Sequence, residues 1–195
     1  RLGLDRPIVA GQSWGGNVVL ELAFHHPGEV TSVTGVDGGF IDLSSSFPSW
    51  DLALEALTPP DLDGMTMEDA GAWLRLQHPD WPETGIAGSV ENLLVGESGR
   101  LERRLPLDRH IEILHQLWNH RPGRRFPRLT VPLLLILATG PGPDAAARVE
   151  KVEQAATATA PGRVALLTGD HDLHAQHPAE VADLIASTAD PGFFG

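Results

Sequence analysis

The stretch Ile-Val-Ala-Gly-Gln-Ser-Trp-Gly-Gly at residues 8–16 joins a short apolar run to a glycine-rich turn with Ser13 at its centre. An apolar-periodic segment from Asn17 to His25 follows, closed by Pro27, and the order predicts strand, sharp turn and helix. In that context G-x-S-x-G is typical of a strained turn that exposes a serine hydroxyl. The turn also puts the backbone N–H of Trp14 at the positive end of the helix, where an oxyanion could bind. The alternative is a turn whose serine only caps the helix.

Three further apolar runs are predicted strands, at residues 30–36, 132–138 and 164–167, and helix candidates lie at 144–159 and 179–187. The run at 132–138 is continuously apolar, as expected of a strand buried on both faces of a parallel sheet. Hairpin signals are absent. We therefore expect an α/β fold, a parallel sheet with helices on both faces, and functional residues at the carboxyl ends of the strands.

The middle of the chain differs in character, with frequent Pro, Gly, Ser and Trp residues and short amphipathic helices predicted at 66–77 and 107–120. The first of these begins with a capping pattern, Thr66 followed by Asp69. We interpret residues 41–127 as a helical cap insertion, and residues 1–40 and 128–195 as the core domain. The four tryptophans of the insertion could wall an apolar substrate pocket or pack its own core: Trp50, Trp73, Trp81 and Trp118.

A second segment carries candidate catalytic residues. It reads Leu-Leu-Thr-Gly-Asp-His-Asp-Leu-His at residues 166–174 and places His171 on a loop just after a predicted strand. A general base must sit at that edge of the sheet to meet Ser13. The alternative is a metal site formed by His171, His174 and His177 with neighbouring aspartates, but the spacing matches no zinc pattern. We expect no metal, and a structural or substrate-lining role for His174.

Two segments, at residues 11–16 and 169–178, resemble the signature segments of α/β-hydrolase-fold proteins, and the resemblance extends to Val36-Asp37-Gly38 and to residues 131–134. It covers the chain except the middle, where that family commonly inserts a helical cap. The resemblance implies a hydrolase with a Ser-His-Asp triad that cleaves an ester, amide or related bond of a small, apolar substrate without a cofactor. The substrate itself does not follow from the fold.

The resemblance implies Ser13 as nucleophile, His171 as base and the Trp14 backbone N–H as oxyanion donor. We also expect Trp14 and His174 to contact the substrate. The acid stays open between two positions. The family usually supplies it after the strand that here ends near Ala138, which indicates Asp144, although the Gly-Pro-Gly-Pro loop at 140–143 departs from the usual shorter turn. Some members take it from the end of the preceding strand, which indicates Asp37.

The family's second oxyanion donor comes from a loop upstream of the nucleophile, but only twelve residues precede Ser13. The chain thus resembles the C-terminal portion of the fold, an incomplete α/β-hydrolase fold lacking the early strands. We hypothesise that the intact protein is longer, or that a homo-oligomer covers the edge strand at Ile8. Two other functions remain as alternatives: a non-catalytic ligand-binding protein on the same fold, and an inactive fragment.

Composition excludes some classes of partner and of chemistry for the 195-residue chain. Its formal net charge is −12 and it has no long basic run, which argues against nucleic acid. The longest apolar run, at 131–138, is far below the roughly 20 residues that a membrane helix needs. Cysteine is absent, so disulfides and thiolate chemistry are excluded, and a cytoplasmic location is mildly favoured.

Overall fold

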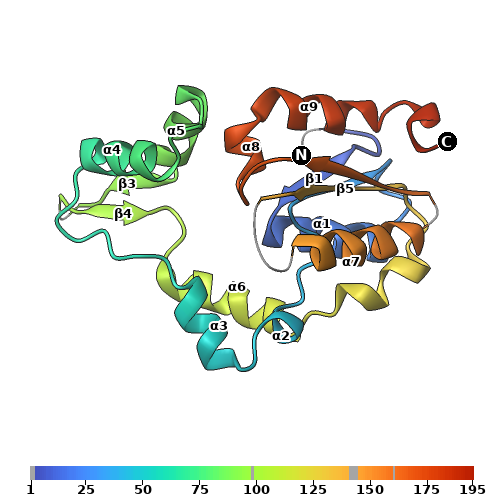
Figure 1. Cartoon of the computed structure of the whole chain (residues 1–195), viewed down its shortest axis with the longest axis horizontal. Helices are drawn as coiled ribbons and strands as arrows, with labels where there is room; N and C mark the ends of the chain where they lie inside the picture. Colours follow the sequence, from blue (N-terminus) through green and yellow to red (C-terminus); the bar gives the residue numbers. More distant parts are fainter. Residues whose placement is uncertain (1–2, 98, 141–144, 160) are drawn as a thin grey trace. The chain divides into compact units, whose positions relative to one another are not determined.

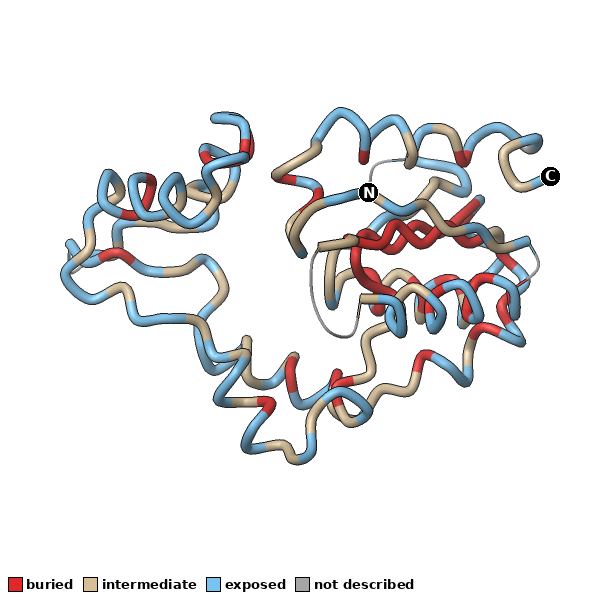
Figure 2. Tube along the Cα trace, viewed as in Figure 1, coloured by how far each residue is buried: buried red, intermediate tan, exposed pale blue. Residues whose placement is uncertain are grey.

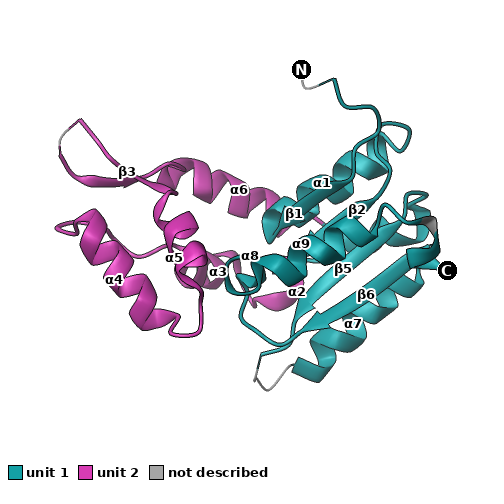
Figure 3. Ribbon diagram, turned by 90° about the horizontal axis from the view of Figure 1, so that it is seen from above, with its two compact units in different colours: residues 1–41, 121–195 teal, residues 42–120 magenta. Residues whose placement is uncertain are grey.

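The computed structural model describes residues 3–97, 99–140, 145–159 and 161–195. The chain forms two compact units, shown in Figure 3: unit 1 consists of residues 1–41 and 121–195, and unit 2 of residues 42–120. The chain returns to unit 1 at residue 121, earlier than the residue 128 expected from the sequence. The reason is that Phe126 and Leu129 are buried in the core of unit 1.

Unit 1 is built on a sheet of four parallel strands in the order β1-β2-β5-β6 (Figure 1). The strands are β1 (Val9–Gln12), β2 (Val33–Val36), β5 (Leu133–Ala138) and β6 (Gly162–Leu167). One face carries α1 (Trp14–His25) and α7 (Ala145–Thr157), and the other carries α8 (Leu173–Gln176) and α9 (Pro178–Ser187). The predicted parallel sheet with helices on its faces is confirmed.

The central strand β5 shows why its sequence is apolar throughout. Side chains alternate across a strand, and Leu133, Leu135 and Leu137 belong to a core with residues of α1 and α7. Leu134 and Ile136 belong to a second core with residues of α8 and α9. All six residues of β5 are buried (Figure 2), and burying each large side chain contributes about 1.5–3 kcal/mol. The strand therefore joins two hydrophobic cores and fixes the centre of the sheet.

Unit 2 contains five α-helices among its described residues: α2 (Leu43–Ser46), α3 (Trp50–Leu57), α4 (Met67–Gln77), α5 (Glu83–Val90) and α6 (Leu107–Asn119). The capping box predicted at the start of α4 is present. The Asp69 backbone N–H donates to Thr66 Oγ1 at 3.1 Å, and the Thr66 backbone N–H donates to Asp69 Oδ2 at 2.9 Å. Two backbone N–H groups at the start of the helix, which have no acceptor within the helix, thereby gain hydrogen-bond partners.

Unit 2 also contains an antiparallel hairpin, β3 (Leu93–Val95) with β4 (Leu101–Arg103), which no signal in the sequence had indicated. Each strand has three residues, too few to show an alternating pattern. The turn depends on glycine: the Gly96 N–H donates to the Arg100 carbonyl oxygen at 2.8 Å, and Gly99 has φ +78°. Across the described ranges, no helix combines the length and apolar character needed to cross a bilayer.

Candidate active site

Ser13 lies in the turn between β1 and α1 with φ 52° and ψ −126°. A positive φ is unfavourable for a residue other than glycine, by about 1–3 kcal/mol, and persists only when the surroundings enforce it. Two backbone hydrogen bonds do so here. The Ser13 N–H donates to the Val36 carbonyl oxygen at 3.0 Å, and the Gly16 N–H donates to the Ser13 carbonyl oxygen at 2.9 Å. Ser13 is therefore held by β2 on one side and by the first turn of α1 on the other.

The glycines around this turn are required by backbone packing. A Cβ atom on Gly11 would lie 2.2 Å from the Gly15 carbonyl oxygen, and one on Gly38 would lie 2.1 Å from the Ser13 carbonyl oxygen. Neither separation is physically tolerable, so the backbone would have to move. The Ser13 turn and the segment after β2 are thus in direct backbone contact, which only glycine at position 38 allows.

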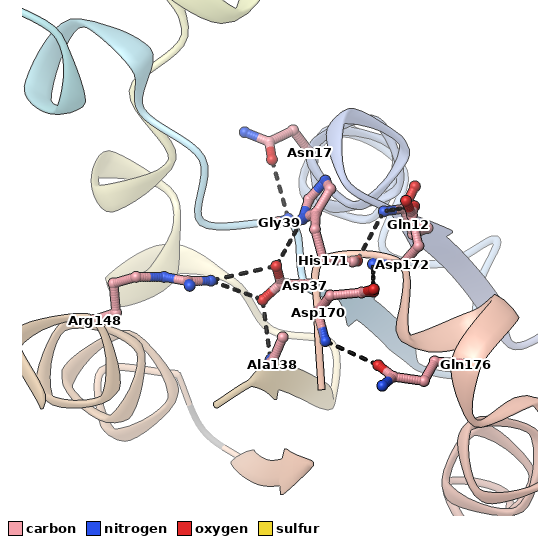
Figure 4. Close-up of polar contacts among 10 residues, drawn as sticks. All are labelled: Gln12, Asn17, Asp37, Gly39, Ala138, Arg148, Asp170, His171, Asp172 and Gln176. Atoms are coloured by element: carbon pink, nitrogen blue, oxygen red, sulfur yellow. Dashed lines mark hydrogen bonds and ion pairs between the residues drawn. The ribbon is translucent and has the colours of Figure 1, made fainter. Parts of the chain in front are cut away.

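Asp37 follows β2 directly, with φ 38°, and is only 3% exposed. Its carboxylate has three partners (Figure 4). Oδ1 accepts from the Ala138 backbone N–H at 3.0 Å and from Arg148 Nη2 at 3.0 Å, and Oδ2 lies 2.7 Å from His171 Nδ1. Such partners are what a buried carboxylate needs to remain ionised.

His171 is on the loop after β6, and its side chain is 52% exposed. An ionised carboxylate only accepts hydrogen bonds, so the contact with Asp37 requires a proton on Nδ1 and directs the reactive lone pair to Nε2. The hydrogen bond to Asp37 raises the pKa of His171, and the negative charges of Asp37 and Asp172 act in the same direction. Partial burial and the positive charge of Arg148 oppose this increase in pKa.

Side chains also fix the loop that carries His171. The Asp170 N–H donates to Gln176 Oε1 at 2.8 Å, and the Asp172 N–H donates to Asp170 Oδ1 at 2.8 Å. From the other side of the site, Gln12 Nε2 donates to the His171 carbonyl oxygen at 3.2 Å. Gln12 directly precedes Ser13, so the loop of the histidine is tied to the turn of the serine.

The structure therefore brings Ser13, Asp37 and His171 to one end of the sheet. Trp14 is the first residue of α1 and is 38% exposed; at this position a backbone N–H has no acceptor within its own helix. His174 lies on α8 and is exposed. Asp144, the first choice of acid from the sequence, is outside the described residues.

A metal site was the alternative interpretation of the histidines. Among the residues that the structure describes, no group of three His, Asp or Glu side chains is arranged to hold a metal ion. His177 instead contacts the Thr168 carbonyl oxygen through Nε2 at 2.9 Å. This contact ties the start of α9 to the end of β6.

The four tryptophans of the middle segment divide into two groups. Trp50 and Trp118 form an edge-to-face pair at 6.0 Å, and Trp81 stacks on His78 at 3.9 Å. These three pack inside unit 2. Trp73 instead lines an apolar cavity of about 300 Å³ in unit 2, together with residues that include Met65 and Leu74.

Three residues of the site escaped the sequence analysis: Gln12, Arg148 and Asn17. Asn17 is 3% exposed; its Oδ1 accepts from the Gly39 N–H at 3.0 Å and its Nδ2 donates to the Ile41 carbonyl oxygen at 2.8 Å. Asn17 lies three positions before Leu20, so the two side chains share the buried face of the helix. A polar residue at such a position is a signal that the sequence analysis could have used. Arg148 gave no signal, because a helix-surface arginine is ordinary in any sequence.

A parallel α/β sheet with a strained serine turn at its carboxyl edge, and a buried aspartate paired there with a loop histidine, defines the architecture of an α/β hydrolase. Comparison with known families agrees: the model of the alpha/beta hydrolase family matches residues 1–184. The chain belongs to the alpha/beta hydrolase family. No curated protein sequence matches the chain significantly.

Solved structures share the fold at low sequence identity. E-2-(acetamidomethylene)succinate hydrolase is 20% identical with a TM-score of 0.70, over 97% of this chain and 68% of that one. The thioesterase domain from the curacin biosynthetic pathway is 19% identical with a TM-score of 0.63, over 94% of this chain and 67% of the domain. The esterase Rv0045c from Mycobacterium tuberculosis is 16% identical with a TM-score of 0.62, over 96% of this chain and 61% of the esterase. The chain thus spans about two thirds of these structures.

Proposed function

We propose that the protein is a serine hydrolase in which Ser13 is the nucleophile, His171 the general base and Asp37 the acid of a catalytic triad. The observation that carries the proposal is the 2.7 Å contact between His171 Nδ1 and Asp37 Oδ2. It fixes the tautomer in which Nε2 can accept a proton, and Gln12 ties the same loop to the residue before Ser13. This arrangement matches the roles that define the Ser-His-Asp triad.

In the proposed reaction, Ser13 Oγ attacks the acyl carbon of an ester, amide or related bond, and its proton moves to His171 Nε2. The tetrahedral oxyanion accepts a hydrogen bond from the Trp14 backbone N–H. His171 then gives the proton to the leaving group, which departs as an alcohol, thiol or amine and leaves an acyl group on Ser13. Water, deprotonated by the same nitrogen, releases the acid and regenerates the hydroxyl.

Asp37 takes up no proton in the proposed cycle. Its charge stabilises the imidazolium that forms when His171 takes the proton, and its contact with Nδ1 holds the ring in one orientation. A buried carboxylate interacts more strongly with this transient cation than an exposed one, because water screens it less. The 3% exposure of Asp37 supports this role.

For the substrate we propose a small acyl ester or thioester with apolar character. The similar structures are those of an esterase, a thioesterase domain and a hydrolase, and we extend the ester and thioester class of bond to this chain. Trp14 and His174 are exposed on unit 1, and we assign both to contact with the substrate. The apolar ring of Trp14 suits a substrate with little charge.

A fluorophosphonate probe tests the proposal, because it phosphonylates only a serine activated by a base. We expect one adduct, mapped by peptide mass spectrometry to Ser13, that is lost in Ser13→Ala and strongly slowed in His171→Asn. Ser44 provides a matched control, since Ser44→Ala removes a hydroxyl that bonds Asp42 in unit 2. Folded protein that binds acyl ligands but never labels would support the non-catalytic binding protein instead.

A further inference from the structure

We propose that Arg148 is a positioning residue of this site, which holds the Asp37 carboxylate in the orientation that His171 requires. The inference deepens the proposed function and rests on it. Arg148 lies on α7, and no motif of the sequence points to it. Its guanidinium reaches the carboxyl end of the sheet from the helix layer beside β5 (Figure 4).

The geometry pins the carboxylate from three elements. The Ala138 backbone N–H at the end of β5 fixes Oδ1 at 3.0 Å, and His171 on the loop after β6 contacts Oδ2. Arg148 Nη2 lies 3.0 Å from Oδ1 and 3.3 Å from Oδ2, so it bridges both oxygens. With the bridge removed, only Ala138 and His171 among these partners would restrain rotation of the carboxylate about its χ2 bond. A rotated carboxylate would turn Oδ2 away from Nδ1.

Charge gives Arg148 a second effect on the same pair. Asp37 is 3% exposed whereas the Arg148 side chain is 47% exposed, so a partly solvated cation neutralises a buried anion. The charged groups that act on His171 are Asp37 and Asp172, which raise its pKa, and Arg148, which lowers it. Asp170 lies in the same loop, where it accepts from the Asp172 N–H. Arg148 therefore limits the rise in pKa and keeps the base unprotonated to lower pH.

The test compares three variants by the pH dependence of kcat and KM for a neutral chromogenic ester. In Arg148→Gln, the midpoint of the acid limb of the kcat/KM pH profile should shift to higher pH by about half a unit or more. The kcat value should also fall about tenfold, because the base is misplaced. Arg148→Lys keeps the charge, but the flexible lysine stem does not hold its ammonium where the rigid guanidinium plane holds Nη2 between the two oxygens. The midpoint of the acid limb should therefore stay near its original pH while kcat falls. The matched control is Lys151→Gln, which removes an exposed charge one turn along α7 and should change neither.

Other outcomes would overturn the inference. If Arg148→Gln left both kcat and the midpoint of the acid limb unchanged, the ion pair would not act on the site. A raised KM with an unmoved limb would instead make Arg148 a substrate contact. A change in melting temperature that Arg148→Lys and Arg148→Gln share, without any change in kcat, would make the ion pair purely structural.

A second measurement separates this inference from the proposed function. The pKa of His171 can be followed by NMR in protein that is not turning over, with its signal among the nine histidines assigned from His171→Gln. A higher pKa in Arg148→Gln than in the original chain supports the inference even if Ser13 never labels. Labelling of Ser13 with equal pKa values in both proteins would leave the proposed function intact and overturn the inference.

Discussion

The side-chain amide of Gln12 donates to the carbonyl oxygen of His171 at 3.2 Å, across 159 positions of the chain. The same Nε2 atom lies 3.3 Å from Asp172 Oδ1. Gln12 ends β1 and His171 follows β6, and these strands are the first and last in the order of the sheet. One side chain therefore links the two edges of the sheet at the end where Ser13 and Asp37 lie.

Replacing Gln12 by Ala should release the loop of His171 and lower kcat by about tenfold, because a base displaced by an ångström loses much of its effect. The melting temperature should change little, since the bonds involved are partly exposed. Gln154→Ala is the matched control: Gln154 lies on α7 and its amide contacts only Glu150 among the described side chains. If Gln12→Ala keeps kcat within about twofold of the control, the loop is held by other contacts.

Replacing each candidate acid by asparagine should show which of the two aspartates is the acid of the triad. Asp37→Asn is expected to lower kcat by about 10³–10⁴-fold, because the amide no longer enforces the reactive tautomer of His171. Asp144→Asn should remain near the original rate. Steady-state kinetics on the same ester would check both, with circular dichroism to verify folding. A large loss in Asp144→Asn alone would assign the acid to Asp144.

The pH dependence follows from the direction of the His171 shift. The hydrogen bond to Asp37 raises its pKa, so kcat/KM should rise with pH along a limb whose midpoint lies above the ordinary value of about 6.5. The same shift means that the folded state binds the proton more tightly than the unfolded chain. Its contribution to stability is complete below about pH 6.5 and is lost as pH rises through the folded-state pKa. A rate independent of pH between about 5 and 8 would contradict His171 as the base.

Local pattern was enough to predict the sheet and the serine turn, because an apolar run such as Leu133–Ala138 and a glycine-flanked Ser13 each determine their own backbone. The acid could not be chosen from sequence. Asp37 and Asp144 both follow predicted strands in the sequence, and spacing alone left both open. The structure pairs Asp37 with His171, and Asp144 lies outside the described residues. Arg148 lies 111 positions from Asp37, and nothing local marks a helix-surface arginine whose partner is so distant.

Gly38→Ala should be strongly destabilising, by about 3 kcal/mol or more. The added Cβ would lie 2.1 Å from the Ser13 carbonyl oxygen, and backbone on both sides would have to shift. Gly15→Ala is the matched substitution in the same motif, and its Cβ would meet nothing within 4 Å. Gly15 is helical, so alanine should stabilise by up to about 1 kcal/mol. Urea unfolding of both variants checks the contrast, and equal free energies of unfolding would contradict the packing described for the turn.

Thr34 lies on β2 and is 0% exposed, and its Oγ1 atom is the only buried side-chain oxygen or nitrogen in the described part of the chain without a hydrogen-bond partner. An unsatisfied buried hydroxyl costs about 1–3 kcal/mol, and valine has nearly the same shape with no polar group. Thr34→Val should therefore raise the free energy of unfolding by about 1 kcal/mol. Thr159 is the control, because it is 3% exposed and its hydroxyl donates to the Phe126 carbonyl oxygen at 3.3 Å and the Ala155 carbonyl oxygen at 3.2 Å. Thr159→Val should lower the free energy of unfolding in the same urea titration, since it removes these buried hydrogen bonds. A Thr34→Val variant destabilised to the same extent would show that the Thr34 hydroxyl is satisfied in solution.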